Sequence, residues 1–262
     1  MQPLAGVRVV EAGQMISAPM AGVIMAEQGA EVIKVELADG VGDRMRQLGS
    51  QRNSMSALFN SVNRGKRSVA VDTKHPDGLQ ALLDLCATAD VFLQNFRPGA
   101  ADRMGVGEAH LRAVNPDIIY VSVSGFGSTG PKAEQKVYDY VIQAMTGMAD
   151  LQQGDTGAPQ LVRQFIVDKT TAITVSQAIT AALFARERGR GGQHVELSML
   201  DIGLWCFWPD GMMDRSLHGD GVVEASHFAD MYSIRPTRDG AVAFVASGNR
   251  TWPNLCLSLI HI

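Results

Sequence analysis

The feature that most constrains the fold is an alternation of short, β-branched apolar runs with segments of helical periodicity. Residues 7–11 and 32–36 are such runs, and the segment between Ser17 and Gly29 carries apolar residues at helical spacing. Ser17 is a residue type that opens helices, and Gly29 is one that ends them. Together these segments predict a strand–helix–strand unit.

The same pattern recurs along most of the chain. We predict further strands over residues 68–71, 91–93, 118–124 and 194–197, helices over residues 75–88, 137–149 and 168–187, and an apolar stretch over residues 199–213. The alternation indicates an α/β fold with a Rossmann-like, mostly parallel sheet covered by helices on both faces. Ligands of such sheets bind at the carboxyl ends of the strands, so we look for the chemistry there.

The pattern changes from about Glu224 onwards. Residues 231–233 and 241–246 flank the turn Arg238-Asp239-Gly240, which is typical of a hairpin. A length of 262 residues, at roughly 150 per domain, allows one or two domains. We predict a large domain over residues 1–223 and the start of a smaller one over 224–262. The apolar residues 257–262 end without a closing turn, which suggests a truncated chain or a non-native terminus.

Charge and cysteine content exclude several classes of protein. The chain has 23 basic and 27 acidic residues, a net charge of -4, which gives no overall attraction to nucleic acid or to an anionic membrane. An anionic ligand would therefore need a local basic site. The three widely spaced cysteines and the absence of a signal peptide or long apolar span indicate a cytoplasmic protein. The six histidines fall singly, so we expect no metal site.

Two motifs, one for dinucleotide binding and one for serine hydrolases, do not support these functions here. Residues 125–130 match G-x-G-x-x-G, but Pro131 follows at once and the segment is not the first strand-to-helix turn, so these glycines indicate a tight loop over some ligand rather than a dinucleotide site. No G-x-S-x-G motif is present, which disfavours a serine hydrolase of the α/β type.

Three polar segments remain as candidates. The turn 63–67 carries three cations and is by itself typical of a solvated turn, whereas Lys74, just before a predicted helix, combines a cation with free N–H groups, as phosphate sites do. Residues 95–99 with Arg103 occupy the equivalent corner of the next unit. Asp168 follows an apolar run and precedes a helix, a position that by itself indicates an N-cap.

Taken together and in order, seven stretches resemble the class III coenzyme A transferase family of the CaiB/BaiF type. They are Pro3–Glu11, Gly29–Glu36, Gly42–Asp43, Asn63–Ser68, Asn95–Gly99, Gly125–Gly127 and Gly189–Gln193. The resemblance implies that Asp168 is a nucleophile that forms an aspartyl-CoA thioester, while CoA passes from an acyl-CoA to a carboxylic acid. It implies CoA as a substrate, with no permanently bound cofactor, and contacts to it from Ile16, Ser17, Val71, Asp72, Thr73, Lys74, Asn95, Phe96, Arg97, Arg103, Lys136, Val137, Tyr138 and Asp139.

The chain departs from the family pattern in two ways. Leu37 stands where some members have an arginine that aids CoA binding. Members are also longer, and a later segment interlocks two ring-like subunits, so the resemblance implies a homodimer for the full-length parent. One alternative is an acyl-CoA racemase, which is disfavoured because Tyr138 stands where related racemases have a histidine base. The other is a non-catalytic, truncated CoA-binding protein.

Overall fold

The computed structural model describes residues 2–153, 157–223, 225, 227–245 and 251–260. Contacts divide the chain into a first unit that ends at Cys206 and a second that begins at Phe207. This division falls inside helix α9 (Met199–Gly211), whereas the sequence places the boundary at 223/224, and Glu224 lies outside the described residues. The predicted domains 1–223 and 224–262 therefore stay a prediction.

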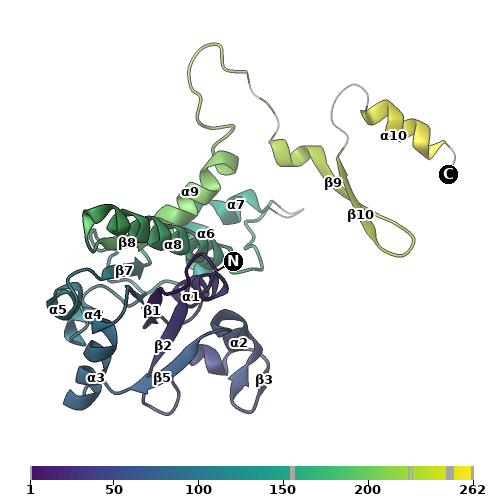
Figure 1. Cartoon of the computed structure of the whole chain (residues 1–262). Coiled ribbons are helices and arrows are strands. Elements are labelled where there is room, and N and C mark those ends of the chain that lie inside the picture. Colours follow the sequence, from purple (N-terminus) through teal and green to yellow (C-terminus); the bar gives the residue numbers. More distant parts are fainter. Residues whose placement is uncertain (1, 154–156, 224, 226, 246–250, 261–262) are drawn as a thin grey trace. The chain divides into compact units, whose positions relative to one another are not determined.

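The first unit is built on a sheet that has six strands in the described part of the chain (Figure 1). In sheet order they are β5 (Arg67–Val71), β2 (Glu31–Leu37), β1 (Arg8–Glu11), β6 (Val91–Gln94), β7 (Ile119–Ser124) and β8 (His194–Ser198). Every neighbouring pair is parallel, which confirms the predicted α/β class. The strand order reverses between β1 and β6, the point where open parallel sheets bind ligands.

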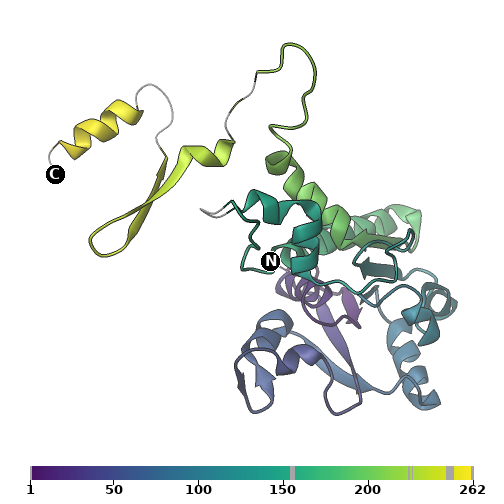
Figure 2. The same cartoon turned by 180° about the vertical axis from the view of Figure 1, so that it is seen from behind.

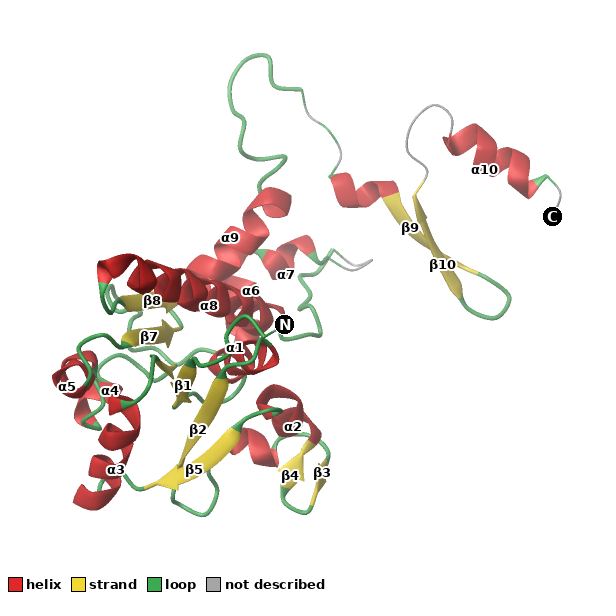
Figure 3. Ribbon diagram, viewed as in Figure 1, coloured by secondary structure: helices red, strands yellow, loops and turns green. Residues whose placement is uncertain are grey.

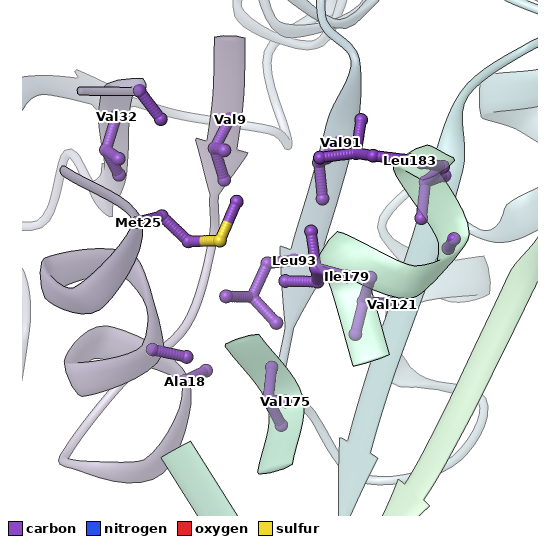
Figure 4. Close-up of a cluster of buried hydrophobic side chains, with 14 of the residues drawn as sticks. Val9, Ala18, Met25, Val32, Val91, Leu93, Val121, Val175, Ile179 and Leu183 are labelled. Carbon is purple, nitrogen blue, oxygen red and sulfur yellow. The ribbon is translucent and has the colours of Figure 1, made fainter. Parts of the chain in front are cut away.

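Helices cover both faces of this sheet (Figure 3). One face packs against α1 (Ser17–Glu27) and α8 (Ile166–Ala185) through Val9, Leu93 and Val121, among others (Figure 4). The other face packs against helices that include α3 (Pro76–Ala87), α4 (Ala100–Arg103) and α5 (Glu108–Val114). Because side chains alternate along a strand, Val9 and its neighbour Val10 belong to different cores.

Two predicted helix boundaries differ from the structure. The helix predicted over 137–149 is two helices, α6 (Asp139–Thr146) and α7 (Met148–Leu151), separated by Gly147 with a φ of 88°. This left-handed conformation suits glycine and ends a helix. Helix α8 begins at Ile166, two residues before its predicted start, so Ile166 and Val167 of the apolar run belong to the helix.

A small insertion after β2 was not predicted. It contains a 3₁₀ helix (Arg44–Gln47), two short strands, β3 (Gln51–Arg52) and β4 (Met55–Ser56), and helix α2 (Ala57–Asn63). Its apolar side chains, among them Met45 and Phe59, form a third core with Ile16. The insertion therefore packs against the chain segment that follows β1.

Buried charges join the insertion to the sheet. The Lys34 ammonium lies 3.1 Å from Glu11 and 3.0 Å from Asp43, and the Lys66 ammonium contacts the second oxygen of Glu11. Lys34, Lys66 and Glu11 are at most 2% exposed. The basic turn 63–67 is therefore only partly solvated: Lys66 is buried, while Arg64 pairs with Glu27 at the surface.

The second unit contains the predicted hairpin. After a 3₁₀ turn (Phe228–Met231), strand β9 (Tyr232–Pro236) pairs with β10 (Ala241–Val245) in antiparallel fashion, and α10 (Thr251–Leu259) follows. Ala246, at the predicted end of the hairpin, lies outside the described residues. Across the residues that the structure describes, every helix is too short or too polar to cross a membrane. The hairpin is seen from behind in Figure 2.

Candidate active site

A pocket of about 800 Å³ opens at the carboxyl ends of β1, β6 and β7. The segment after β1 contributes Gln14 to Ser17, the segment after β6 contributes Asn95 to Pro98, and the end of β7 contributes Val123 to Gly125. Residues Gln135 to Tyr140, which lead into α6, and Asp168 add to the wall. The pocket therefore lies at the switch point of the sheet, where the parallel topology predicts a ligand site.

Asn95 ties the first two of these segments together. Its side-chain oxygen accepts the backbone N–H of Gln14 at 2.8 Å, and its amide donates to the Gln14 carbonyl at 2.8 Å and to the Ser17 hydroxyl at 3.3 Å. Met15 between them has a left-handed φ of 66°, which is uncommon for a side chain of this kind. This anchoring fixes the start of helix α1 beside the pocket.

Three helices begin at this pocket. Helix α1 follows Ile16, α6 follows Tyr138 and α8 follows Phe165, and none of these three N-cap side chains accepts a hydrogen bond from its own helix. Helix amino termini carry unpaired N–H groups and a partial positive charge. The pocket is therefore suited to bind an anion or to stabilise negative charge that develops during a reaction.

Two aspartates meet at these helix ends. Asp168 is the third residue of α8, and its backbone N–H donates to the Asp139 carboxylate at 2.8 Å. Asp139 is 1% exposed and also accepts the Gln143 amide at 2.5 Å. Asp139 thus caps α8 from a neighbouring helix, and its carboxylate faces the helix carrying the predicted nucleophile.

The surroundings of Asp168 favour its protonated form. Burial raises the pKa of its carboxyl, the nearby charge of Asp139 raises it further, and Ser17 lowers it through its hydroxyl and backbone N–H, with the result that the pKa is about 7. A carboxyl with this pKa is partly ionised at neutral pH. It is also more basic than an ordinary aspartate, which makes its ionised form a better nucleophile.

Gln143 holds the segment that leads into α8. Fully buried in α6, it accepts the backbone N–H of Val162 at 2.9 Å and donates to the Gln164 carbonyl at 3.0 Å. Because the same amide group binds Asp139, a single side chain links the capping carboxylate to the loop before Asp168. The position of Asp168 therefore depends on contacts between residues about 25 positions apart.

The structure brings together most of the residues predicted for the site. Those that line the pocket are Ile16, Ser17, Asn95, Phe96, Arg97, Lys136, Val137, Tyr138, Asp139 and Asp168. Gly125 makes the approach of Val137 possible, since a Cβ there would lie 2.0 Å from a Val137 methyl carbon. Asp139 contributes mainly through its buried carboxylate, which is already engaged with Asp168 and Gln143.

The remaining predicted residues lie outside this pocket. Val71, Asp72, Thr73 and Lys74 end strand β5 and begin the turn to α3, where Asp72 accepts the Lys74 backbone N–H at 2.9 Å. Since β5 is three strand spacings from β6, this corner is about 14 Å from the pocket segment after β6. Arg103, at the end of α4, lies beside Gly99. Only an extended ligand reaches all of these residues.

Sequence reasoning missed several residues of the pocket wall. Gln14 and Met15 follow directly after β1, and Phe165 precedes α8, so their place next to strand and helix ends was available as a signal. Met45 and Leu58 come from the insertion after β2. Nothing local in the sequence places those two side chains at the end of β1.

Comparison with known proteins gives a consistent result. The pattern that defines CoA-transferase family III matches residues 4–260. The chain is 33% identical to the succinate–glutarate CoA-transferase of Agrobacterium fabrum, covering 97% of this chain and 66% of that protein. It is also 33% identical to the succinyl-CoA:glutarate CoA-transferase of Mus musculus, covering 98% of this chain and 59% of that protein.

A solved structure supports the same relationship. The crystal structure of a CaiB/BaiF family protein from Brucella suis superposes with a TM-score of 0.87 at 31% sequence identity, over 98% of this chain and 69% of that one. The chain therefore spans roughly three fifths to two thirds of the length of the relatives it matches.

Proposed function

Since the chain belongs to CoA-transferase family III, we propose that it transfers CoA from an acyl-CoA thioester to a carboxylic acid, with Asp168 as the covalent nucleophile. The observation that carries this proposal is the half-buried Asp168 carboxyl at a pocket where α1 and α6 begin without a side-chain cap and where α8 is capped by Asp139. A nucleophile and a group of unpaired N–H donors are the two elements that acyl transfer requires.

In the first step, an Asp168 oxygen attacks the thioester carbonyl carbon. The carbonyl oxygen becomes an oxyanion, which the uncapped amino termini of α1 and α6 stabilise, and the C–S bond then breaks to release CoA thiolate. The product is a mixed anhydride between Asp168 and the acyl group. No proton moves, because the nucleophile and the leaving group are both anions.

In the second step, the thiolate attacks the side-chain carbonyl carbon of Asp168. The donor acid leaves as a carboxylate, and Asp168 is left as an aspartyl-CoA thioester. An acceptor carboxylate then attacks the carbonyl carbon of the aspartyl-CoA thioester and releases CoA thiolate, which leaves a mixed anhydride of Asp168 and the acceptor. The thiolate attacks the acceptor's carbonyl carbon in this anhydride, forms the acceptor's CoA ester and releases free Asp168. Two acyl transfers between activated groups thus replace one exchange between weak nucleophiles.

The cations are proposed to hold the CoA phosphates. Arg97 and Lys136 line the pocket and have no ion-pair partner among the described residues. Lys74 and Arg103 would meet parts of the ligand that extend along the sheet edge, with backbone and side-chain contacts from Val71, Asp72 and Thr73. Binding energy from these remote contacts then positions the thioester at Asp168.

Racemisation is the weaker alternative. Tyr138, at the position where related racemases have a histidine, is 63% exposed at the pocket wall, and a phenol is a poor general base at neutral pH. The family relationship also supports a homodimeric, cytoplasmic enzyme that uses acyl-CoA and a carboxylic acid as substrates.

The test is covalent trapping. The protein is incubated with succinyl-CoA, quenched with hydroxylamine, digested and analysed by mass spectrometry. We expect a hydroxamate on Asp168 that is absent from Asp168→Asn, while CoA affinity of the variant, measured by calorimetry, stays within a few-fold. An adduct on another carboxylate in an active protein contradicts the assignment of the nucleophile. Loss of CoA binding in the variant would instead indicate that Asp168 is needed for the pocket itself.

A further inference from the structure

A second pocket, of about 420 Å³, lies on the sheet face that α4 and α5 border. Its floor is formed by side chains on one face of three neighbouring strands: Gln94 of β6, Ser122 of β7, and His194 and Glu196 of β8. Loop residues 127–129, which belong to the glycine-rich segment 125–130 and do not line the CoA pocket, line this one.

Three of the side chains in this pocket form a hydrogen-bonded chain. The Ser122 hydroxyl lies 3.0 Å from Nε2 of His194, and Nδ1 of His194 lies 2.8 Å from the Glu108 carboxylate. In the neutral imidazole with its proton on Nδ1, the Nδ1–H group donates a hydrogen bond to the Glu108 carboxylate. The unprotonated Nε2 can then accept a proton from the Ser122 hydroxyl. This is the order nucleophile, base and orienting carboxylate that serine hydrolases use.

Neighbouring groups fix the donor and acceptor directions of these hydrogen bonds. The backbone N–H of Phe96 donates to the Gln94 oxygen at 2.6 Å, so the Gln94 amide faces Ser122 and donates to its oxygen at 3.0 Å. The Ser122 oxygen is therefore already an acceptor, and its own proton is free to point at His194. Each hydrogen bond in the series is thereby directed toward Glu108.

Packing fixes the ring and the carboxylate. The His194 ring meets the Tyr120 ring edge-on at 5.1 Å, and Tyr120 donates its own hydroxyl to the Val106 carbonyl. Burial opposes ionisation of Glu108, but the hydrogen bond and charge of Arg112, with the hydrogen bond from His194, outweigh it and hold the pKa of Glu108 below its usual range. His194 and Glu108 nevertheless remain 29% and 34% exposed, so a ligand can reach them.

We propose that Ser122, His194 and Glu108 form a second catalytic site that hydrolyses small esters. Ser122 Oγ bonds to the ester carbonyl carbon and passes its proton to His194 Nε2, which gives it to the departing alcohol oxygen as the C–O bond breaks. Water then attacks the acyl-serine, its proton returns through His194 to Ser122, and the acid is released. Within the described residues, the backbone N–H groups of Ser128 and Thr129 have no acceptor in the chain, so they are available to the developing oxyanion.

The charges around this pocket restrict its substrates. Among the described residues, Asp102, Glu108, Glu196 and Asp201 line it with one exposed cation, Arg97, which it shares with the wall of the CoA pocket, so the surroundings of Ser122 are acidic. Such a pocket repels a polyanion such as CoA and favours esters of uncharged or cationic alcohols. Its volume suits a short acyl group. The absent G-x-S-x-G motif argues only against a serine at a strand-to-helix elbow, whereas Ser122 lies within a strand.

The experiment is covalent labelling of the whole chain with a fluorophosphonate, followed by mapping of the modified peptide. We expect a single adduct on Ser122. His194→Gln should lower the labelling rate at least about 100-fold, the usual contribution of a general base. His110→Gln, an exposed histidine on the same helix as Glu108, should label at the rate of the unmodified protein. Glu108→Gln should slow labelling, and Glu108→Asp should restore most of it, since a carboxylate is required to orient the imidazole.

Hydrolysis supplies the second readout. p-Nitrophenyl acetate and acetylcholine should be hydrolysed faster than in buffer, and Ser122→Ala should abolish this excess rate. Acetyl-CoA, which carries the same acyl group on a polyanion, should show no hydrolysis that depends on Ser122. The proposal is wrong if the unmodified protein is neither labelled nor active on these esters, or if Ser122→Ala retains the rate of the unmodified protein.

Discussion

The carboxylate of Asp139 accepts the backbone N–H of Asp168 at 2.8 Å, so one aspartate caps the helix on which the other is presented. The contact has two opposite effects. It stabilises the amino terminus of α8 through a hydrogen bond and a favourable charge at the helix end. It also places a negative charge near the Asp168 carboxyl, which raises the pKa of that group.

The two effects of Asp139 can be separated by substitution. Asp139→Asn keeps one oxygen for the Asp168 N–H, loses the acceptor for the Gln143 amide and removes the charge, so the pKa of Asp168 should fall and the pH profile of adduct formation should shift to lower pH. Asp139→Ala removes both and should in addition lower the free energy of unfolding by about 1–2 kcal/mol, as lost helix caps do. Single-turnover assays and chemical denaturation measure the two quantities. An unchanged pH profile in Asp139→Asn would show that its charge does not act on Asp168.

The rate of adduct formation should rise with pH around neutrality. Only ionised Asp168 attacks the thioester, and its pKa is about 7. At pH 6 about a tenth of the carboxyl is ionised, so the single-turnover rate should be roughly tenfold below its plateau near pH 8. Rapid-quench measurements between pH 5.5 and 8.5 check this. A flat profile over that range contradicts a nucleophile with this pKa.

The same pKa predicts an effect on stability. Because the pKa of Asp168 is raised from about 3.8 to about 7 on folding, the folded state binds more protons than the unfolded state between these values, and stability falls as pH rises through this window. Asp168→Asn has no carboxyl to ionise at this position, so its stability should not fall for this reason as pH rises. Its melting temperature should therefore exceed that of the unmodified protein at pH 8, by about 2–4 °C for each kcal/mol of difference in the free energy of unfolding. The difference should shrink toward pH 4. Equal differences at both pH values would contradict the raised pKa.

Arg97 and Lys136 should each contribute strongly to CoA affinity. Charge-assisted contacts to phosphate are worth roughly 1.5–3 kcal/mol, so Arg97→Ala and Lys136→Ala should each weaken CoA binding about 10- to 100-fold in calorimetry. The matched control is Lys132→Ala, which removes a cation from the same loop as Lys136 but outside the pocket wall. If all three variants bind CoA alike, the phosphates are held elsewhere, and Lys74 and Arg103 become the residues to test.

Lys66 should matter for folding more than its surface neighbours do. Its ammonium is buried against Glu11, so Lys66→Met leaves part of a buried carboxylate uncompensated, and the free energy of unfolding should fall by about 3–5 kcal/mol. Arg64→Met, two residues earlier, breaks an ion pair with Glu27 whose partners are 57% and 54% exposed, and should cost less than about 1 kcal/mol. Urea titrations of both variants decide the matter. Similar losses in the free energy of unfolding for the two variants would contradict a stabilising role of the buried contact between Lys66 and Glu11.

The sequence by itself determined the class of fold and the edge of the sheet at which to look for chemistry. Strands such as 119–124 and helices such as 76–87 are specified by side-chain periodicity and by local start and stop residues, which depend only on near neighbours in the chain. The pocket lining by Asn95 and Arg97, which directly follow β6, has the same origin, because the carboxyl ends of parallel strands share one edge of the sheet.

Only the tertiary structure decided what individual polar groups do. Lys66 and Arg64 belong to one basic turn, yet one is buried and the other is solvated, because Glu11 lies on a strand more than fifty residues away. Asp139 caps α8 and Ser122 meets His194 for the same reason: strand order and helix packing bring together residues that are distant in the sequence. Local patterns carry no record of such partners, because burial and charge pairing depend on which elements become neighbours in the folded chain.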